Sequence, residues 1–310
     1  MRLVSIIRKE KQDPSMRNFK EIGKEILFNI QEEIYLPLFY TEVNFRLICK
    51  AMRTLVMKFG GAALETSKHF FNVATIIQEK RVDYPRLVVV VSAMHGVTDQ
   101  LTELAHQVTK KPSKRELDML ISVGERVSMS LLAMTLEDKG IEAISLTGSQ
   151  SGIMTCTAHR EAQITTVRPQ RIEHHLNQGK VVIVAGFQGV SVEKEITTLG
   201  RGGSDTSAVA LGIALGVEKV EFYKDVKGVF SEDPKGNPQA TLYEKLTFEE
   251  ALKFKNPLHP RSILLASKNG LPLQVISFKK DHATFFPGTW IMGKSGKKRN
   301  PCYEVETAHI

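Results

Sequence analysis

The sequence of 310 residues contains only three cysteines, too few and too scattered for a disulfide scaffold. Cys49, Cys156 and Cys302 have none of the paired spacings that bind zinc. We therefore expect a reducing compartment, the cytoplasm. No apolar stretch approaches the roughly 20 residues that cross a bilayer, and residues 1–20 mix acidic and basic side chains without the hydrophobic centre of a secretory signal. We expect no membrane partner.

Signatures of nucleic-acid binding are also missing, although the formal net charge is +8. The basic residues are scattered, and no helix-turn-helix, zinc-finger spacing or aromatic-glycine RNA signature is present. We expect no nucleic-acid partner, and an anionic nucleotide substrate explains part of the charge. With 42% hydrophobic residues, the chain is globular and long enough for one two-lobed domain.

The two common nucleotide fingerprints, the dinucleotide glycine motif and the P-loop, are absent from residues 55–64. Instead, an apolar run ends in Lys58, Gly60 and Gly61 and is followed by a helical pattern. A lysine beside exposed backbone amides can neutralise charge on a phosphoryl group during transfer. Taken alone, the same pattern also describes a tight turn with a solvated lysine.

Residues 198–208 combine three glycines, hydroxyls, Arg201 and Asp205 at the junction of a loop and a helix. Glycines let backbone N–H groups approach a ligand, and the start of a helix carries partial positive charge. Arg201 suits a carboxylate or phosphate, and Asp205 can organise a lysine, a metal or an amine. The alternative is a helix capped by Ser204 and Asp205 after a flexible turn.

Apolar runs alternate with helical patterns between residues 52 and 293, which predicts a three-layer α/β sandwich with a mostly parallel central sheet. In such a sheet, ligands gather at the carboxyl ends of the strands, where the loops named above lie. We expect strands at 54–58, 87–92, 142–146, 181–185, 219–223 and 273–277. We expect helices at 66–80, 98–109, 116–138, 168–177, 205–215, 247–254 and 261–268.

An ordered set of further motifs accompanies these two loops, at 88–99, 120–128, 145–152, 181–189 and 223–235. Together they resemble the catalytic domain of aspartate kinases, within the amino acid kinase family, over about residues 52–291. The stretches 116–120, 146–150 and 185–189 resemble that subfamily in particular. The resemblance implies the three-layer α-β-α fold of amino acid kinases, which carbamate kinase shares.

We predict three regions along the chain. Residues 1–51 form an extension with one amphipathic helix, whose apolar side carries Ile22, Ile26, Leu27, Ile30 and Ile34. Residues 52–293 form the catalytic domain, with a substrate lobe at about 52–190 and a nucleotide lobe at about 191–293. Residues 294–310 form a basic tail. Met52 leads directly into the first strand and is an alternative natural start. The regulatory ACT domains usual in the family do not follow, so we expect no feedback control through them.

The resemblance implies ATP-dependent phosphorylation of the side-chain carboxylate of L-aspartate to 4-phospho-L-aspartate. This reaction is the first step towards lysine, threonine, methionine and diaminopimelate, and we expect the enzyme to be a homodimer. By resemblance, Arg201 binds a substrate carboxylate, Glu125 binds the ammonium group, and Thr98 and Ser204 donate hydroxyl hydrogen bonds. The structural alternatives are capped turns for Thr98 and Ser204 and a buried ion pair with Arg126 for Glu125.

The resemblance also assigns the nucleotide site. Lys58 stabilises the transferring phosphoryl group, Asp205 holds Lys58, and Gly60 and Gly61 donate backbone hydrogen bonds. Residues 224–235 match the nucleotide-binding loop of the family, in which Asp225, Phe230 and Lys235 are the candidate contacts for ribose, the adenine edge and phosphate, respectively. Lys224 is a further candidate nucleotide-binding residue. A surface hairpin is the alternative. Mg²⁺ is expected to bridge the ATP phosphates with few protein ligands, so no metal-ligating residue is assigned.

Five positions depart from the family pattern. Ala62 and Ala63 replace hydroxyl residues, Asn256 replaces a nucleotide-binding lysine, and Lys224 stands where Ser or Thr is common. Lys235 replaces an arginine. These changes keep two other functions open: a catalytically impaired binding or regulatory subunit, and a kinase for another acidic amino acid.

Overall fold

The computed structural model describes residues 53–232, 236–237, 239–254, 257–279, 288–293 and 300–305. The chain divides into two compact units, Met1–Met52 and Arg53–Ile310, and every described residue belongs to the second. The predicted N-terminal helix, Lys235, Asn256 and most of the basic tail lie outside the described residues. The division into substrate and nucleotide lobes stays a prediction.

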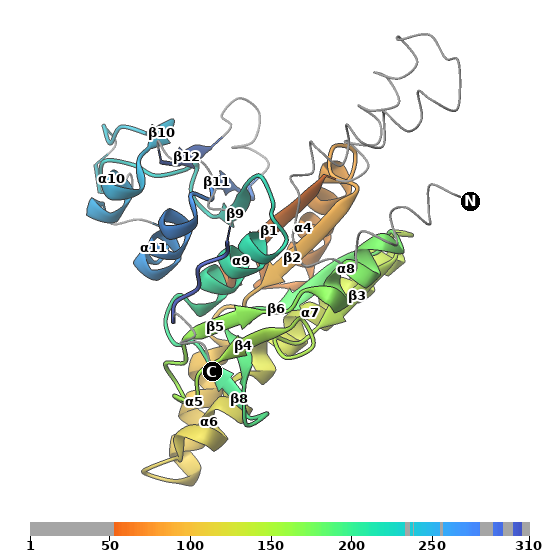
Figure 1. Ribbon diagram of the computed structural model, residues 1–310, viewed down its shortest axis with the longest axis vertical. Helices are drawn as coiled ribbons and strands as arrows, with labels where there is room; N and C mark the ends of the chain where they lie inside the picture. Colours follow the sequence, from red (N-terminus) through yellow and green to blue (C-terminus); the bar gives the residue numbers. More distant parts are fainter. Residues whose placement is uncertain are drawn as a thin grey trace. The chain divides into compact units, whose positions relative to one another are not determined.

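The main sheet has eight strands in the order β10-β12-β11-β9-β1-β2-β6-β3 (Figure 1). All neighbours are parallel except β11 and β12, which are antiparallel. Its strands are β1 (Thr54–Phe59), β2 (Arg86–Val91), β3 (Ala143–Leu146), β6 (Val181–Ala185), β9 (Val220–Lys224), β10 (Lys245–Leu246), β11 (Leu273–Ser277) and β12 (Thr289–Ile291). The central strands are buried on both faces, which explains why they read as continuous apolar runs.

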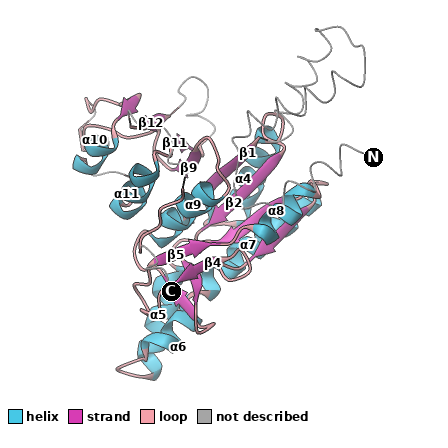
Figure 2. Ribbon diagram, in the orientation of Figure 1, coloured by secondary structure: helices cyan, strands magenta, loops and turns pink. Residues whose placement is uncertain are grey.

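Helices cover both faces of this sheet (Figure 2). Alternate residues of β1 show the two sides: Leu55 and Met57 belong to one core with α4 (Ser67–Lys80) and α7 (Val123–Asp138). Val56 belongs to the other core, with α8 (Gln170–Asn177), α9 (Gly203–Ala214), α10 (Phe248–Lys253) and α11 (Pro260–Asn269). The predicted three-layer α/β sandwich with a mostly parallel sheet is confirmed.

The single helix predicted at 116–138 is wrong, because the structure has α6 (Lys114–Ile121) and α7 separated at Ser122. The Ser122 hydroxyl donates to the Met119 carbonyl at 3.0 Å, and the Ser122 carbonyl accepts from Gln188 Nε2 at 2.8 Å. These two bonds involve the carbonyls at the boundary between α6 and α7.

By length and composition alone, Lys114–Asp138 could cross a membrane, and it is the one such stretch in the described part of the chain. The expectation that no stretch reaches that length is therefore wrong. The reason is that α7 supplies core residues, among them Met129, Leu132 and Leu136, to the face of the sheet that it covers.

A second sheet was not predicted. Its order is β5-β4-β7-β8, with β4 (Ile153–Thr155), β5 (Ile164–Val167), β7 (Gln188–Ser191) and β8 (Ile196–Thr198). Strand β8 leads directly into residues 199–202 before α9, which we call the glycine-arginine loop. This small sheet therefore carries part of the predicted site. The remaining elements are the short helix η1 (Gly61–Leu64), which follows β1, and α5 (Val97–Val108), which follows β2.

Candidate active site

A buried cluster of three charged side chains lies where two strands of the large sheet end and one helix begins. Lys58 lies near the carboxyl end of β1, Lys224 ends β9, and Asp205 lies in the first turn of α9. Lys58 Nζ is 2.6 Å from Asp205 Oδ1, and Lys224 Nζ is 3.1 Å from Asp205 Oδ2. The structure therefore brings Lys58 and Asp205 together, as expected, and adds a second lysine to the pair.

Electrostatics fix the protonation state of this cluster. Burial alone would raise the pKa of Asp205, but the two neighbouring ammonium groups lower it to about 2. Burial and the charge of Lys58 lower the pKa of Lys224 to about 8, against the opposing effect of Asp205. At neutral pH two cations therefore face one anion, and the surplus positive charge suits an anionic ligand.

The cluster opens onto a cleft of about 360 Å³. Among the predicted nucleotide-binding residues, the cleft is lined by Lys58, Gly60, Gly61, Lys224 and Asp225. A Cβ atom on Gly61 would lie 2.9 Å from the carbonyl oxygen of Ala93, so only glycine lets the loop after β1 approach the loop after β2 this closely. The replaced hydroxyl positions, Ala62 and Ala63, also line this cleft.

Sequence reasoning missed four residues that line the same cleft: Ser92, Tyr223, Pro257 and Phe278. The ring of Tyr223 stacks on Phe59 with centroids 4.5 Å apart. Ser92, Tyr223 and Phe278 each lie at or just after the carboxyl end of a strand. The rule that ligands gather at those ends could have found them.

Glu125 lies buried in the first turn of α7, and only one of its two carboxylate oxygens has a hydrogen-bond partner. Its Oε1 accepts a hydrogen bond from the Ala93 N–H at 3.0 Å, whereas its Oε2 has no hydrogen-bond partner. Burial raises the pKa of Glu125 to about 7, more than the Ala93 hydrogen bond and the charge of Lys58 lower it. Of the ion pairs between described residues, none joins Glu125 to Arg126. A buried carboxylate in this state is typical of a ligand site.

The other predicted substrate contacts occupy the loops around these two groups. Ser204 is buried in the first turn of α9, where its Cβ is 2.8 Å from the position that a Cβ on Gly186 would occupy. Thr98 is half-buried in the first turn of α5. The helix caps are Gly202 and Gly96, and neither helix has a side-chain cap hydrogen bond, so the capping alternatives are wrong. Asp205 is held by the lysines instead.

Arg201 is exposed in the loop between β8 and α9. It stands between Gly200 and Gly202, whose φ angles of 72° and 71° lie in the left-handed region that favours glycine. The two glycines make the sharp turn that presents Arg201 at the start of α9, close in sequence to Ser204 and Asp205.

Phe230 and Lys235 are the last predicted nucleotide contacts. Phe230 forms an antiparallel bridge with Leu242, and the Ser231 N–H donates to the Thr241 carbonyl at 2.9 Å, which is the geometry of a hairpin. Phe230 is not among the residues that line the cleft, and Lys235 lies outside the described residues. Their nucleotide contacts stay predictions.

Comparison with known proteins identifies relatives of this chain. The aspartokinase of Bacillus sp. (strain MGA3) is 42% identical over 264 residues, which cover 84% of this chain and 64% of that protein. The aspartokinase of Geobacillus stearothermophilus is 47% identical over 230 residues, covering 73% of this chain and 56% of that protein. The chain thus spans less than two thirds of the length of these relatives.

The crystal structure of aspartate kinase from Synechocystis superposes with a TM-score of 0.68 at 42% identity, covering 80% of this chain and 40% of that one. Aspartokinase III of E. coli, crystallised with aspartate and ADP, shares the fold with a TM-score of 0.70 at 24% identity. Residues 53–277 match the model of the amino acid kinase family. This match covers most of the chain, and the chain therefore belongs to the amino acid kinase family.

Proposed function

We propose that this chain transfers the γ-phosphoryl group of ATP to the side-chain carboxylate of L-aspartate, giving 4-phospho-L-aspartate and ADP. The observation that carries the proposal is the buried cluster of Lys58, Asp205 and Lys224, which faces a glycine-lined cleft. The names of the two aspartokinase relatives support aspartate as the acceptor. The reaction begins the biosynthesis of the aspartate-derived amino acids, and the scattered cysteines favour the cytoplasm.

The acceptor needs no general base, because a carboxyl with a pKa near 4 is already ionised at neutral pH. A carboxylate oxygen of aspartate forms a bond to the γ-phosphorus, and the bond from that phosphorus to the bridging oxygen breaks, releasing ADP. Lys58 neutralises charge on the transferring group, and Asp205 fixes the position of the Lys58 ammonium. Gly60 and Gly61 donate backbone hydrogen bonds to the phosphates.

Lys224 adds a second cation at the place where relatives commonly have Ser or Thr. Because it shares the Asp205 carboxylate with Lys58 and lines the cleft, we assign it to the phosphates. Asp225 is exposed at the cleft and is assigned to the ribose. Phe230 and Lys235 keep their predicted contacts with the adenine edge and phosphate.

Aspartate presents two carboxylates and one ammonium group. The unpartnered Oε2 of Glu125 fits the ammonium, because an ion pair there would satisfy a buried oxygen that otherwise has no partner. Arg201 binds the carboxylate that does not react, and Thr98 and Ser204 donate hydroxyl hydrogen bonds.

Mg²⁺ would enter with the nucleotide. The described residues contain no group of three or more His, Cys, Asp or Glu side chains suited to a metal ion. Asp205 is occupied by two lysines and Asp225 is assigned to the ribose, so the residues fit a metal held mainly by phosphate oxygens and water. Its chemistry there would be to neutralise charge on the phosphates.

A homodimer is also part of the proposal. Val123, Val127, Leu131 and Met134 are all exposed on α7, with the spacing of one helix face. Such a face buries its apolar surface when it packs against a second copy. Light scattering after size exclusion should give twice the chain mass, and Leu131→Glu should give the monomer; a monomeric wild type would contradict this part.

The test of the function is acyl phosphate trapping. Purified protein is incubated with ATP, Mg²⁺ and aspartate, and hydroxylamine converts 4-phosphoaspartate to a coloured hydroxamate. Sustained formation that needs both ATP and aspartate supports the proposal. Binding of ATP and aspartate without turnover would favour a regulatory subunit, and turnover only with another acidic amino acid in a substrate panel would identify a different kinase.

A further inference from the structure

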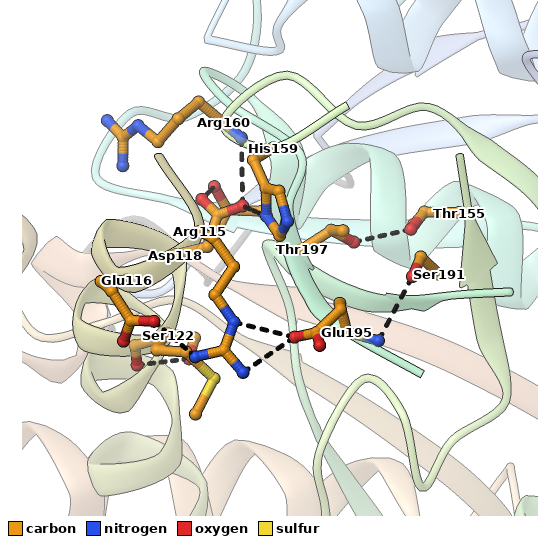
Figure 3. Close-up of polar contacts among 12 residues, drawn as sticks. Arg115, Glu116, Asp118, Ser122, Thr155, His159, Arg160, Ser191, Glu195 and Thr197 are labelled. Carbon is orange, nitrogen blue, oxygen red and sulfur yellow. Dashed lines mark hydrogen bonds and ion pairs between the residues drawn. The ribbon is translucent and has the colours of Figure 1, made fainter. Parts of the chain in front are cut away.

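Asp118 is a buried carboxylate away from the residues assigned to substrate and nucleotide. It lies in α6, is fully buried, and accepts hydrogen bonds from three groups (Figure 3). These are the Thr198 hydroxyl at 2.5 Å, His159 Nδ1 at 2.8 Å and the Arg160 N–H at 3.1 Å. A buried carboxylate is costly unless it is well satisfied, so this one is expected to hold its partners firmly.

These partners come from separate parts of the chain. Thr198 ends β8, while His159 and Arg160 belong to the loop between β4 and β5. Arg160 has a φ of 77°, a left-handed conformation that is unfavourable for a residue with a side chain, and its N–H donation to Asp118 helps to fix it. Asp118 therefore ties α6 to both the small sheet and the loop beside it.

The glycine-arginine loop contacts two of the groups that donate hydrogen bonds to Asp118. Only Leu199 and Gly200 separate Thr198 from Arg201. A Cβ on Gly200 would lie 2.9 Å from the Arg160 carbonyl oxygen, so the loop touches the Arg160 backbone directly. The Ala162 N–H also donates to the Thr198 carbonyl at 3.0 Å. Asp118 thus holds both Thr198, immediately before this loop, and the Arg160 backbone, against which Gly200 packs.

Asp118 also lies one helical turn before the junction that leads to Glu125, where the Ser122 N–H donates to the Asp118 carbonyl at 3.1 Å. Helix α6 runs into α7 at Ser122, whose carbonyl accepts from Gln188 in β7. Asp118 and Ser122 thus fix the junction that leads to Glu125, while Asp118 fixes the strand that leads to Arg201.

We propose that Asp118 is a positioning residue for the acceptor site: through Thr198 and the Arg160 backbone it holds the 198–203 loop so that Arg201 meets the carboxylate of the substrate. This inference rests on the proposed function. It assigns no contact between Asp118 and the substrate, and it concerns aspartate binding rather than nucleotide binding.

The chain offers a matched pair of variants for the test. Thr198→Val removes the hydroxyl that binds Asp118, and Thr197→Val removes a neighbouring buried hydroxyl that lies 2.6 Å from the Thr155 hydroxyl (Figure 3). Both are conservative changes of the same size on adjacent residues of one strand. Thr198→Val should raise the KM for aspartate about tenfold, the usual effect of losing a hydrogen bond to a charged group, and leave the KM for ATP unchanged. Thr197→Val should leave both constants unchanged.

A double-mutant cycle with Arg201→Ala shows whether the effect passes through Arg201. In the Arg201→Ala background, Thr198→Val should raise the KM for aspartate less than twofold. Equal effects of Thr197→Val and Thr198→Val, or a full Thr198→Val effect without Arg201, would overturn the inference while leaving the proposed function intact. A wild type that does not phosphorylate aspartate would contradict the proposed function and the inference with it.

Discussion

The two ends of β9 carry clusters of the same composition, one buried carboxylate between two lysines. Near the amino end, Glu221 Oε1 lies 2.9 Å from Lys80 Nζ and 2.7 Å from Lys219 Nζ. Its Oε2 accepts from the Tyr223 hydroxyl at 2.7 Å. At the carboxyl end, Asp205 lies between Lys58 and Lys224.

The surroundings of the lysines distinguish the clusters. At Glu221, Lys219 Nζ lies 4.9 Å from the centroid of the Trp290 ring and 5.9 Å from that of Tyr84, so the protein itself satisfies this cation. At Asp205, both lysines line the cleft and keep donors for a ligand. The two clusters therefore differ in position rather than in composition, and we infer that the position at the carboxyl ends of parallel strands makes the Asp205 cluster the candidate site.

The largest expected effect separates these two clusters. Lys58→Ala should lower kcat by on the order of a hundredfold or more, because it removes an electrostatic donor at the reacting phosphoryl group. Lys219→Ala removes a lysine of the other cluster and should leave kcat near the wild-type value. It should instead lower the free energy of unfolding in urea by roughly 1–3 kcal/mol, the cost of a lost buried charged hydrogen bond. Equal losses of kcat would remove the distinction between the clusters.

A second prediction contrasts Glu125 with the well-satisfied Glu221. Glu125→Gln should raise the KM for aspartate by on the order of tenfold to a hundredfold, because the ammonium loses its anionic partner, and should leave the KM for ATP unchanged. In the wild type the KM for aspartate should rise as pH falls below about 7, where Glu125 becomes protonated. Steady-state kinetics from pH 6 to pH 9 should show no such rise in the variant. Equal damage to both substrates would count against the ammonium contact.

The same Glu125→Gln substitution that weakens aspartate binding should stabilise the protein in the absence of ligand. The folded pKa of Glu125, about 7, is above its ordinary value of 4.5, so the carboxylate costs stability as pH rises through this window. Glu125→Gln should therefore be more stable than the wild type at pH 8, by about 3 kcal/mol. The difference should shrink towards pH 5 in urea unfolding curves. A variant less stable than the wild type at pH 8 would mean that Glu125 is satisfied in the free protein.

The smallest expected effect concerns a departure from the family pattern. Ala62→Thr restores a hydroxyl at the cleft and should lower the KM for ATP about threefold, the scale of one exposed hydrogen bond. Asp83→Ala, away from the cleft, serves as a control and should leave that constant unchanged. An unchanged KM for ATP in Ala62→Thr would show that Lys224 already compensates for the missing hydroxyl.

Much of the site was predictable because the carboxyl ends of parallel strands lie at the same edge of a sheet. The predicted strands at 54–58 and 219–223 closely match β1 and β9, and the expected contact between Lys58 and Asp205 is present. The small sheet escaped prediction because strands of three or four residues are too short to show a period.

Other features depend on long-range contacts that sequence patterns do not reveal. The helix break at Ser122 is accompanied by a bond from Gln188, which is far away in sequence. Tyr223 and Phe278 are not among the predicted site residues, because an aromatic side chain at a strand end does not indicate which surface it faces. The unpartnered oxygen of Glu125 likewise emerges only when its surroundings are known.

The most direct test of the central claim is a crystal structure with aspartate and a non-hydrolysable ATP analogue. We predict that Lys58 Nζ, still paired with Asp205, lies about 3 Å from an oxygen of the γ-phosphoryl group, with aspartate between Glu125 and Arg201. A complex in which the analogue binds outside this cleft, or in which Lys58 makes no contact with it, would contradict the account.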